Sequence, residues 1–346
     1  MTPMQKFETA RDKYLDNLRF SERSENTVKN YETRLNAFLG FWSSISGENG
    51  PDTDPDYSTV EAWRTSLVKS GAAASTVKQY LLELSQFFRA FQKPIFGKTL
   101  QYAENPVAEE FYPKVHKKPY DQILTDEQVL RLIPDRCPSP QAKPTWARNY
   151  AIIALLLTSK IRNSELRALT PADLDWEYGE ITVEHGKGDK FRVVEFTPFA
   201  QSAMRLYLQS GIRPAGLSDR DPLFGTTATA DFGEFGKSGK WHAGSRQWLS
   251  EVVERHVYSL TGVHDVRSHD LRHVGARLNL NAGASLEQLQ SELGHASMAT
   301  TQIYSGMLLQ RRGRNSARQV AAAMDEQAQK NDAKFDLRQP PVKTAV

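Results

Sequence analysis

Apolar side chains recur at spacings of three and four in two stretches of the first hundred residues, one after Ser24 and one after Ser75. This spacing gives an α-helix one apolar face, because the helix turns once in about 3.6 residues. A shorter helix is predicted from Thr59 to Ser70. The positions expected to be buried are Val28, Tyr31, Leu35, Phe38, Leu39, Trp42, Val77, Tyr80, Leu81, Leu84, Phe87, Phe88 and Phe91. We therefore predict a small helical domain at residues 1–104.

The helical spacing fades between Phe96 and Gln122. Prolines at positions 106, 113 and 119 would interrupt any helix there, since proline lacks the amide hydrogen that a helix needs. We predict that residues 105–121 link the helical domain to a second one.

The remainder of the chain mixes helical and extended patterns. Its predicted elements are a helix opened by Thr125, a buried helix from Trp146 to Leu157, a short helix from Ser164 to Leu169, strands from Glu180 to Val183 and from Arg192 to Phe196, and helices from Arg246 to about Ala323. The turn-forming Gly186 to Asp189 would join the strands, and the Gly-rich span from Gly225 to Gly244 is expected to be a loop. We predict a mixed α/β domain at 122–328 and a disordered polar tail at 329–346, which makes the fold mainly α with a small β-sheet.

The amino-acid composition favours a globular protein and argues against disulfide-rich and membrane-spanning classes. With 39% hydrophobic and 25% charged residues among 346, the chain is expected to be globular, soluble and built of two domains. A single cysteine, Cys137, excludes a disulfide framework within the chain and a Cys-rich zinc cluster, and favours the reducing cytoplasm or nucleoid. The apolar run from Ala151 to Leu157 is shorter than the roughly 20 residues that span a bilayer, so no membrane partner is expected. A formal net charge of +3 permits nucleic-acid binding without requiring it.

Five short strings in the predicted second domain carry residues suited to phosphate chemistry. They are Ile161-Arg162-Asn163-Ser164-Glu165-Leu166, Gly186-Lys187-Gly188-Asp189-Lys190-Phe191-Arg192, His269-Asp270-Leu271-Arg272-His273, Leu293-Gly294-His295 and Thr300-Thr301-Gln302-Ile303-Tyr304. Their order and spacing closely resemble the tyrosine recombinase, or phage integrase, family of Xer- and Cre-like recombinases. The resemblance covers about Gln122 to Gln310 and, more loosely, the helical first domain, which is similar to that family's SAM-like core-binding domain.

This resemblance implies a set of catalytic residues. The set would be Arg162, Lys187, His269, Arg272, His295 and Tyr304. A tyrosine nucleophile that becomes joined to the cut strand keeps the bond energy for rejoining, but a phenol with a pKa of about 10 needs cationic surroundings and a proton acceptor. Two arginines with forked N–H donors would stabilise the charge that builds on the non-bridging phosphate oxygens.

The other members of the set have roles in proton transfer. The leaving 5′-oxygen must be protonated, and Lys187 in the predicted hairpin is favoured for this over its neighbour Lys190. His269 and His295 would donate to the scissile phosphate, and His269 is also a candidate base for Tyr304. Because side chains supply the positive charge, we expect no metal and no other cofactor.

Each assignment has a structural alternative. Arg162 could simply pair with Glu165 at a helix terminus, and Tyr304 could be a core aromatic. His269 and His273 have the four-residue spacing of a zinc-binding pair, although no third ligand is evident.

Near the catalytic set, one position departs from the family pattern and two others match it. A glycine is common two positions before the first arginine of the family, whereas this chain has Lys160, which either alters the local turn or adds a cation near the phosphate. Glu165 matches an acidic residue that would orient its neighbours, and His273 matches a frequent second histidine with a supporting role.

Lysines outside the second domain are candidates for DNA binding. Lys29 and Lys78 open two helices with nearly the same residues, Thr-Val-Lys-Asn-Tyr and Thr-Val-Lys-Gln-Tyr, and a helix N-terminus attracts phosphate. Coincidence between two ordinary amphipathic helices is the alternative. Lys117 and Lys118 in the linker would follow a nucleic-acid backbone, or would only keep the linker solvated.

The resemblance implies a site-specific DNA recombinase that integrates or excises a virus or mobile element through a 3′-phosphotyrosyl intermediate on Tyr304. The expected partners are double-stranded DNA with a specific recombination site and further copies of the chain, as a homo-tetramer on two sites in a prokaryotic cell. The predicted helix from Ser316 to Gln327 would dock on a neighbouring copy or cap its own domain. A type IB topoisomerase and a non-catalytic, integrase-derived regulator are the alternatives.

Overall fold

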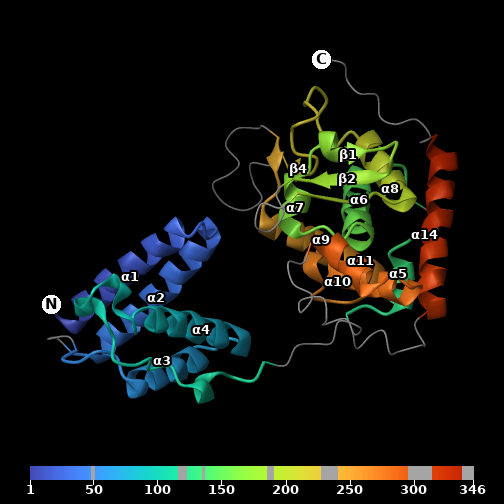
Figure 1. Cartoon of the computed structure of the whole chain (residues 1–346). Coiled ribbons are helices and arrows are strands. Elements are labelled where there is room, and N and C mark those ends of the chain that lie inside the picture. The colour runs from blue at the N-terminus through green and yellow to red at the C-terminus, as the bar shows by residue number, and fades with distance from the viewer. Residues whose placement is uncertain are drawn as a thin grey trace. The chain divides into compact units, whose positions relative to one another are not determined.

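The computed structural model describes residues 1–47, 51–115, 123–134, 137–184, 191–226, 241–294 and 314–336. The chain divides into two compact units, Met1–Lys117 and Lys118–Val346, and each is described by itself (Figure 1). The described part is mostly helical with two small sheets, which confirms the predicted fold class.

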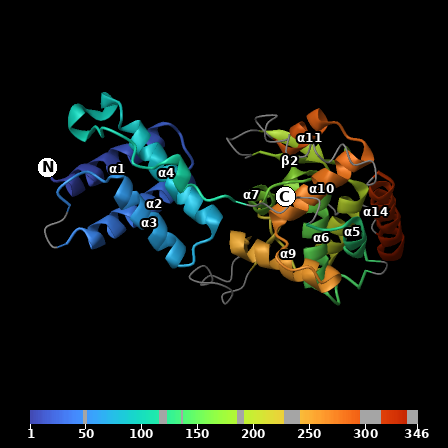
Figure 2. The same cartoon turned by 90° about the horizontal axis from the view of Figure 1, so that it is seen from below.

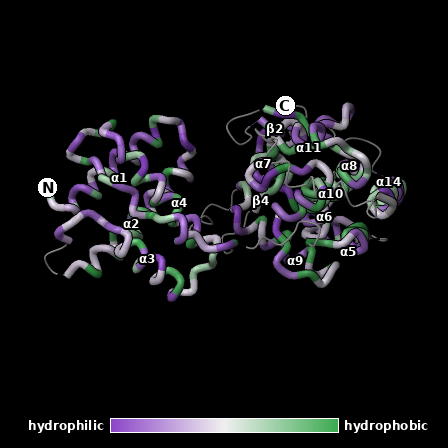
Figure 3. Tube along the Cα trace, turned by 60° about the horizontal axis from the view of Figure 1, so that its bottom comes forward, coloured by the Kyte–Doolittle hydropathy of each residue, from purple (hydrophilic) through white to green (hydrophobic). Residues whose placement is uncertain are grey.

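Four α-helices build the first unit. They are α1 (Pro3–Phe20), α2 (Glu25–Ile45), α3 (Tyr57–Lys69) and α4 (Ala74–Ala90). The side chains of Ser24 and Asp56 accept hydrogen bonds from the backbone amides of Thr27 and Thr59, which fixes the starts of α2 and α3. Hydrophilic and hydrophobic residues alternate along these helices (Figure 3), and their apolar faces meet in a core rich in aromatic rings. Helix α1 was not predicted from the sequence, although its residues Phe7 and Ala10 are fully buried.

The first unit extends past the predicted boundary at residue 104. Three short 3₁₀ helices follow α4, at Pro94–Phe96, Lys98–Leu100 and Glu109–Phe111. Val107 and Phe111 are buried in the first core, and the Asn105 side chain donates a hydrogen bond to Ser85 Oγ at 2.8 Å. The prediction that a linker begins at residue 105 is therefore wrong at that end, because apolar residues beyond Pro106 close over the helices.

A buried helix forms the centre of the second unit. In the described part of this unit, the α-helices are α5 (Asp126–Arg131), α6 (Pro144–Thr158), α7 (Asn163–Ala168), α8 (Pro198–Gln209), α9 (Arg246–Thr261), α10 (Ser268–Ala282), α11 (Leu286–Leu293) and α14 (Arg314–Phe335). The run from Tyr150 to Thr158 of α6 is buried on every face, and α8, α9 and α10 pack around it. Within the described ranges, no helix has the length and apolar character needed to cross a membrane.

Two small antiparallel sheets accompany these helices. Strands β1 (Leu174–Asp175), β2 (Glu180–Val183) and β3 (Arg192–Glu195) form one sheet in that order, with Ile181 opposite Val194. Strands β4 (Gly225–Thr226) and β5 (His242–Ala243) pair as well. The expected loop from Gly225 to Gly244 is thus wrong at its two ends, where the backbones approach so closely that a Cβ on Gly225 would lie 2.3 Å from the His242 carbonyl oxygen.

Helix α14 runs to Phe335, beyond the predicted start of a disordered tail at residue 329. Asn331 is buried, and the Lys334 ammonium donates to the Cys137 carbonyl oxygen at 2.9 Å, so contacts of the tail with the unit hold the last turns. Along one side of the second unit, α14 packs on α5, α8 and α10 of the same chain (Figures 1 and 2). In this structure the helix caps its own domain.

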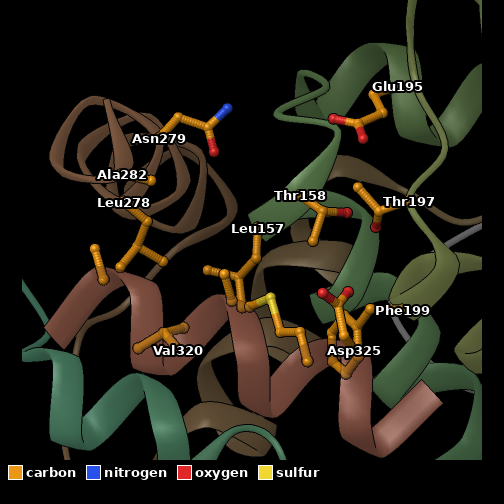
Figure 4. A pocket seen from close by; sticks show the side chains of 13 residues that line it. Leu157, Thr158, Glu195, Thr197, Phe199, Leu278, Asn279, Ala282, Val320 and Asp325 are labelled. Carbon is orange, nitrogen blue, oxygen red and sulfur yellow. The ribbon is translucent and has the colours of Figure 1, made fainter. Parts of the chain in front are cut away.

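A pocket remains between α14 and the helices beneath it (Figure 4). Apolar side chains of Leu157, Phe199, Leu278 and Val320 line it, with Asp325 among the polar residues. Of the predicted catalytic residues, the three that the structure describes, Arg162, His269 and Arg272, do not line this pocket.

Helix packing at Gly275 is predicted to tolerate no side chain. A Cβ there would lie 2.0 Å from the Leu157 carbonyl oxygen of α6. Gly275→Ala should therefore lower the free energy of unfolding by about 1–3 kcal/mol through overpacking. Gly40→Ala in α2 is the matched control, because a Cβ at Gly40 meets nothing within 4 Å. We expect it to stabilise the first unit by about 0.5 kcal/mol, measured by urea denaturation. Equal stability changes in the two variants would contradict this account.

Candidate active site

Arg162 lies directly before α7 and connects that helix to the end of α11. Its guanidinium donates from Nη1 to Glu165 Oε1 at 2.7 Å and from Nη2 to the carbonyl oxygens of Leu293 and Gly294, both at 2.9 Å. Its backbone amide donates to Glu165 Oε2 at 2.6 Å. The alternative that Arg162 only pairs with Glu165 is therefore incomplete, because the same guanidinium also reaches α11.

Arg272 reaches the same place from α10. Its side chain is almost fully buried and donates to the carbonyl oxygens of Lys160 and Leu293. The Leu293 oxygen thus accepts hydrogen bonds from both Arg162 and Arg272, so the two guanidinium groups are direct neighbours. Two adjacent forked donors form the arrangement that can hold the oxygens of one phosphate.

The end of α11 supplies the acceptors because a helix leaves its last carbonyl groups without partners inside the helix. Gly294 ends α11 in the left-handed conformation, with φ of +57°. The Glu292 carbonyl oxygen accepts from Arg192 Nε at 3.3 Å, next to the carbonyls that Arg162 and Arg272 occupy. The partial negative charge of a helix C-terminus favours such cationic partners.

Glu165 is the buried counter-charge of this cluster. Both of its oxygens accept from Arg192, at 2.8 and 2.7 Å, in addition to the bonds from Arg162. Burial alone would raise the Glu165 pKa, but the hydrogen bonds from Arg192 and from the Arg162 amide outweigh it and lower the pKa to about 2. Glu165 is therefore a carboxylate at neutral pH that holds Arg162 and Arg192, and its supporting role in a reaction stays a prediction.

His269 lies one turn before Arg272 on α10 and keeps an exposed side chain. Partial loss of hydration lowers its pKa below the ordinary 6.5, Arg272 lowers it further, and Asp270 opposes the change. A neutral imidazole beside two arginines can accept a proton or donate a hydrogen bond. His273 packs edge-on against it, with ring centroids 4.3 Å apart. Within the described ranges no group of three potential metal ligands forms around this pair or elsewhere.

Several predicted residues lie outside the described part of the chain. They are Lys117, Lys118, Lys187, His295 and Tyr304. Two described residues border them in sequence and belong to the arginine cluster. Arg192 opens β3 after the segment that contains Lys187, and Gly294 directly precedes His295.

Arg192 was not predicted as a site residue, and the sequence did not decide the conformation of the turn at Lys160. Arg192 belongs to one of the five strings, so the signal was present, but its bonds to Glu165 depend on tertiary structure. Lys160 adopts φ of +51°, the conformation that a glycine would take most easily, so the turn is formed in spite of the side chain. Its ammonium is buried and pairs with Glu292, and so does not reach outward toward a phosphate.

In the first unit, Lys29 and Lys78 occupy different ends of a helix pair. Hydrogen bonds join Tyr31 to Gln86 and Arg34 to Glu83. The later residue of α2 therefore contacts the earlier residue of α4, which shows that the two helices run antiparallel. Lys29 is exposed and pairs with Glu25 at 3.0 Å. If both lysines contact DNA, they contact different phosphates.

Two models of known protein families match this chain. The profile of the phage integrase family matches residues 122–310, and that of the phage integrase N-terminal SAM-like domain matches residues 12–93. The chain belongs to the phage integrase family. The family includes the tyrosine recombinases, as the sequence predicts, and the SAM-like first domain is confirmed with it.

Relatives in this family match almost the whole chain. A tyrosine recombinase XerC from Oceanobacillus iheyensis is 31% identical over 307 residues, which cover 87% of this chain and 92% of that protein. Another XerC, from Lactobacillus delbrueckii subsp. bulgaricus, is 32% identical over 302 residues, 86% of this chain and 92% of that one.

Solved structures of family members share the fold. The XerH site-specific recombinase bound to palindromic difH substrate in a post-cleavage complex has a TM-score of 0.60 and 23% identity, with 88% of this chain and 83% of that one covered. The Tn1549 transposon integrase in complex with circular intermediate DNA has a TM-score of 0.59 and 18% identity, with 88% and 95% covered.

The charge on Glu165 should make this phage integrase family member sensitive to acid. The folded-state pKa of about 2 lies below the ordinary value of 4.5. The resulting stabilisation, on the order of 3 kcal/mol, is present above pH 4.5 and is lost as pH falls toward 2. Glu165→Gln should lack this pH-dependent part, measured as unfolding free energy against pH. An exposed control, Glu180→Gln, should keep the wild-type profile, and equal profiles for wild type and Glu165→Gln would contradict the assignment.

The pKa of His269 is predicted to lie below the ordinary histidine value of 6.5. NMR titration of the imidazole signals, assigned with His269→Asn, should give a midpoint below 6.5 because partial burial and Arg272 both disfavour the imidazolium. Asp270→Asn removes the opposing carboxylate and should lower the midpoint further. A midpoint at or above the ordinary value would show that the arginines do not act on this ring.

Proposed function

We propose that this protein is a site-specific DNA recombinase that cleaves and rejoins DNA through a 3′-phosphotyrosyl intermediate on Tyr304. The observation that carries the proposal is the meeting of Arg162 and Arg272 at one carbonyl oxygen, with His269 beside them and His295 next in sequence. Membership of the phage integrase family supports it.

The arginines would bind the scissile phosphate and stabilise its transition state. Charge that develops on the non-bridging oxygens during attack is best met by donors already fixed in place, because their reorganisation then costs little. Glu165 and the end of α11 fix both guanidinium groups before DNA binds. The cluster retains excess positive charge, which the phosphate would neutralise.

The remaining groups would handle protons and the covalent bond. The Tyr304 oxygen would attack phosphorus, its proton would pass to a base such as His269, and Lys187 would protonate the leaving 5′-oxygen. The 5′-hydroxyl of the partner strand would then attack the phosphotyrosyl bond and release Tyr304. The bond that forms equals the bond that breaks, so the proposal needs neither ATP nor a metal.

The proposed substrate is double-stranded DNA with a specific recombination site. Four copies of the protein would bind two such sites as a homo-tetramer in the cytoplasm. Lys29, Lys78, Lys117 and Lys118 are proposed phosphate contacts. Integration or excision of a virus or mobile element is the biological role that the sequence analysis favours. The two XerC relatives are named as tyrosine recombinases, so they support site-specific recombination and do not specifically support integration of a virus or mobile element.

A nicked substrate that traps the covalent intermediate tests the proposal. The DNA site is first selected from random duplexes by binding to the full chain. On that site, wild type should form an SDS-resistant adduct, and Tyr304→Phe should reduce adduct formation by about 1,000-fold or more while DNA affinity stays unchanged. Tyr178→Phe, at an exposed tyrosine, is the control and should react as wild type.

The same assay separates the alternatives. An adduct on the Tyr304→Phe variant would reassign the nucleophile. Binding of wild type without any adduct would favour the non-catalytic regulator. Relaxation of supercoiled DNA without exchange between two sites would favour the type IB topoisomerase.

A further inference from the structure

Lys160 is a buried lysine that the chemistry proposed above does not use. Its side chain is only 1% exposed, and its backbone lies in the left-handed region that favours glycine. A lysine is among the residues least often buried, unless its charge has a partner. The position lies between the end of α6 and Arg162.

The Lys160 ammonium has two partners in the described part of the chain. It donates to the Thr158 carbonyl oxygen at 2.7 Å and pairs with Glu292 Oε2 at 2.9 Å. The same Glu292 oxygen accepts from Asn279 Nδ2 at 3.2 Å. Lys160 thereby connects the α6–α7 turn to α11, and Asn279 adds α10 to the network.

These are the segments that also carry the arginine cluster. The carbonyl oxygen of Lys160 accepts from Arg272, and Glu292 directly precedes Leu293, whose carbonyl accepts from both arginines. One residue therefore holds Arg272 with its backbone and the end of α11 with its side chain. A shift of α11 would displace the acceptors that both guanidinium groups depend on.

We propose that Lys160 and Glu292 form a positioning pair that fixes the C-terminal end of α11 against Arg162 and Arg272. The pair sets the rate of DNA cleavage and leaves DNA affinity unchanged, because it holds the carbonyl acceptors and does not itself contact DNA. This role rests on the proposed recombinase function and goes beyond it, since the family commonly has glycine at the position of Lys160.

The first test measures single-turnover cleavage of the nicked site at saturating protein. Lys160→Met and Glu292→Gln should each slow cleavage by about 10- to 100-fold, the effect of a small misplacement of catalytic groups, with no change in Kd. The double variant should be no slower than Lys160→Met, because both changes break one interaction. Lys160→Gly, which relieves the backbone but removes the ammonium, should be as slow as Lys160→Met.

The second test needs no catalysis. Amide hydrogen exchange at residues 290–294 should be faster in Lys160→Met than in wild type, because the end of α11 opens more often. Arg277→Met is the matched control, since it breaks another buried ion pair, Arg277 with Asp126 at 2.6 Å, away from the arginine cluster. It should lose stability, yet keep the cleavage rate per folded molecule and the exchange at 290–294.

Three results would overturn the proposal. They are wild-type cleavage in the single variants, additive losses in the double variant, and unchanged exchange at the end of α11. Weaker DNA binding at an unchanged cleavage rate would instead make Lys160 a DNA contact. A wild-type protein that forms no adduct refutes the recombinase function, and hydrogen exchange then still decides whether the pair holds α11.

Discussion

The second unit depends on holding several positive charges close together without neutralising all of them. Four positively charged side chains surround the end of α11, namely Arg162, Arg192, Arg272 and Lys160. Neighbouring like charges repel strongly in a poorly hydrated interior. Glu165 and Glu292 supply two negative charges, and the open carbonyl groups of the helix end supply the remaining acceptors. A helix terminus suits this purpose because it attracts cations and carries no full charge that would repel a phosphate.

This balance explains why the site is built from backbone as well as side chains. Further carboxylates would stabilise the arginines more, but they would also oppose binding of an anionic substrate. Backbone oxygens fix the guanidinium groups and leave the excess positive charge in place. The buried cations lower the free energy of unfolding unless each of them has well-formed hydrogen bonds.

The two units solve different physical problems. The first has an aromatic core, in which Phe7, Phe38, Phe87 and Phe88 are fully buried, and its buried acidic residue, Glu83, pairs with Arg34. The second unit buries charge at the end of α11, while its apolar helix α6 forms the core and α14 packs on α5, α8 and α10.

Much of this was determined by the sequence alone. Amphipathic spacing located α2 and α4, and a continuous apolar run located α6. Five short strings identified the family and made Arg162, His269, Arg272 and Tyr304 the candidate catalytic residues. Local patterns suffice there because helix faces and motifs are properties of neighbouring residues.

Tertiary structure alone decided the partners of those residues. No local pattern predicts that the Leu293 carbonyl accepts from both arginines, or that Arg192 pairs with Glu165. The burial of Lys160 and the packing of α14 and Val107 likewise depend on distant segments. Every residue has a backbone carbonyl oxygen, so the sequence does not show which of them accept hydrogen bonds from a distant side chain. The sequence also does not show whether a charged residue is solvated or buried. Only the folded chain shows which distant segments come together, and here they meet at the last turn of α11.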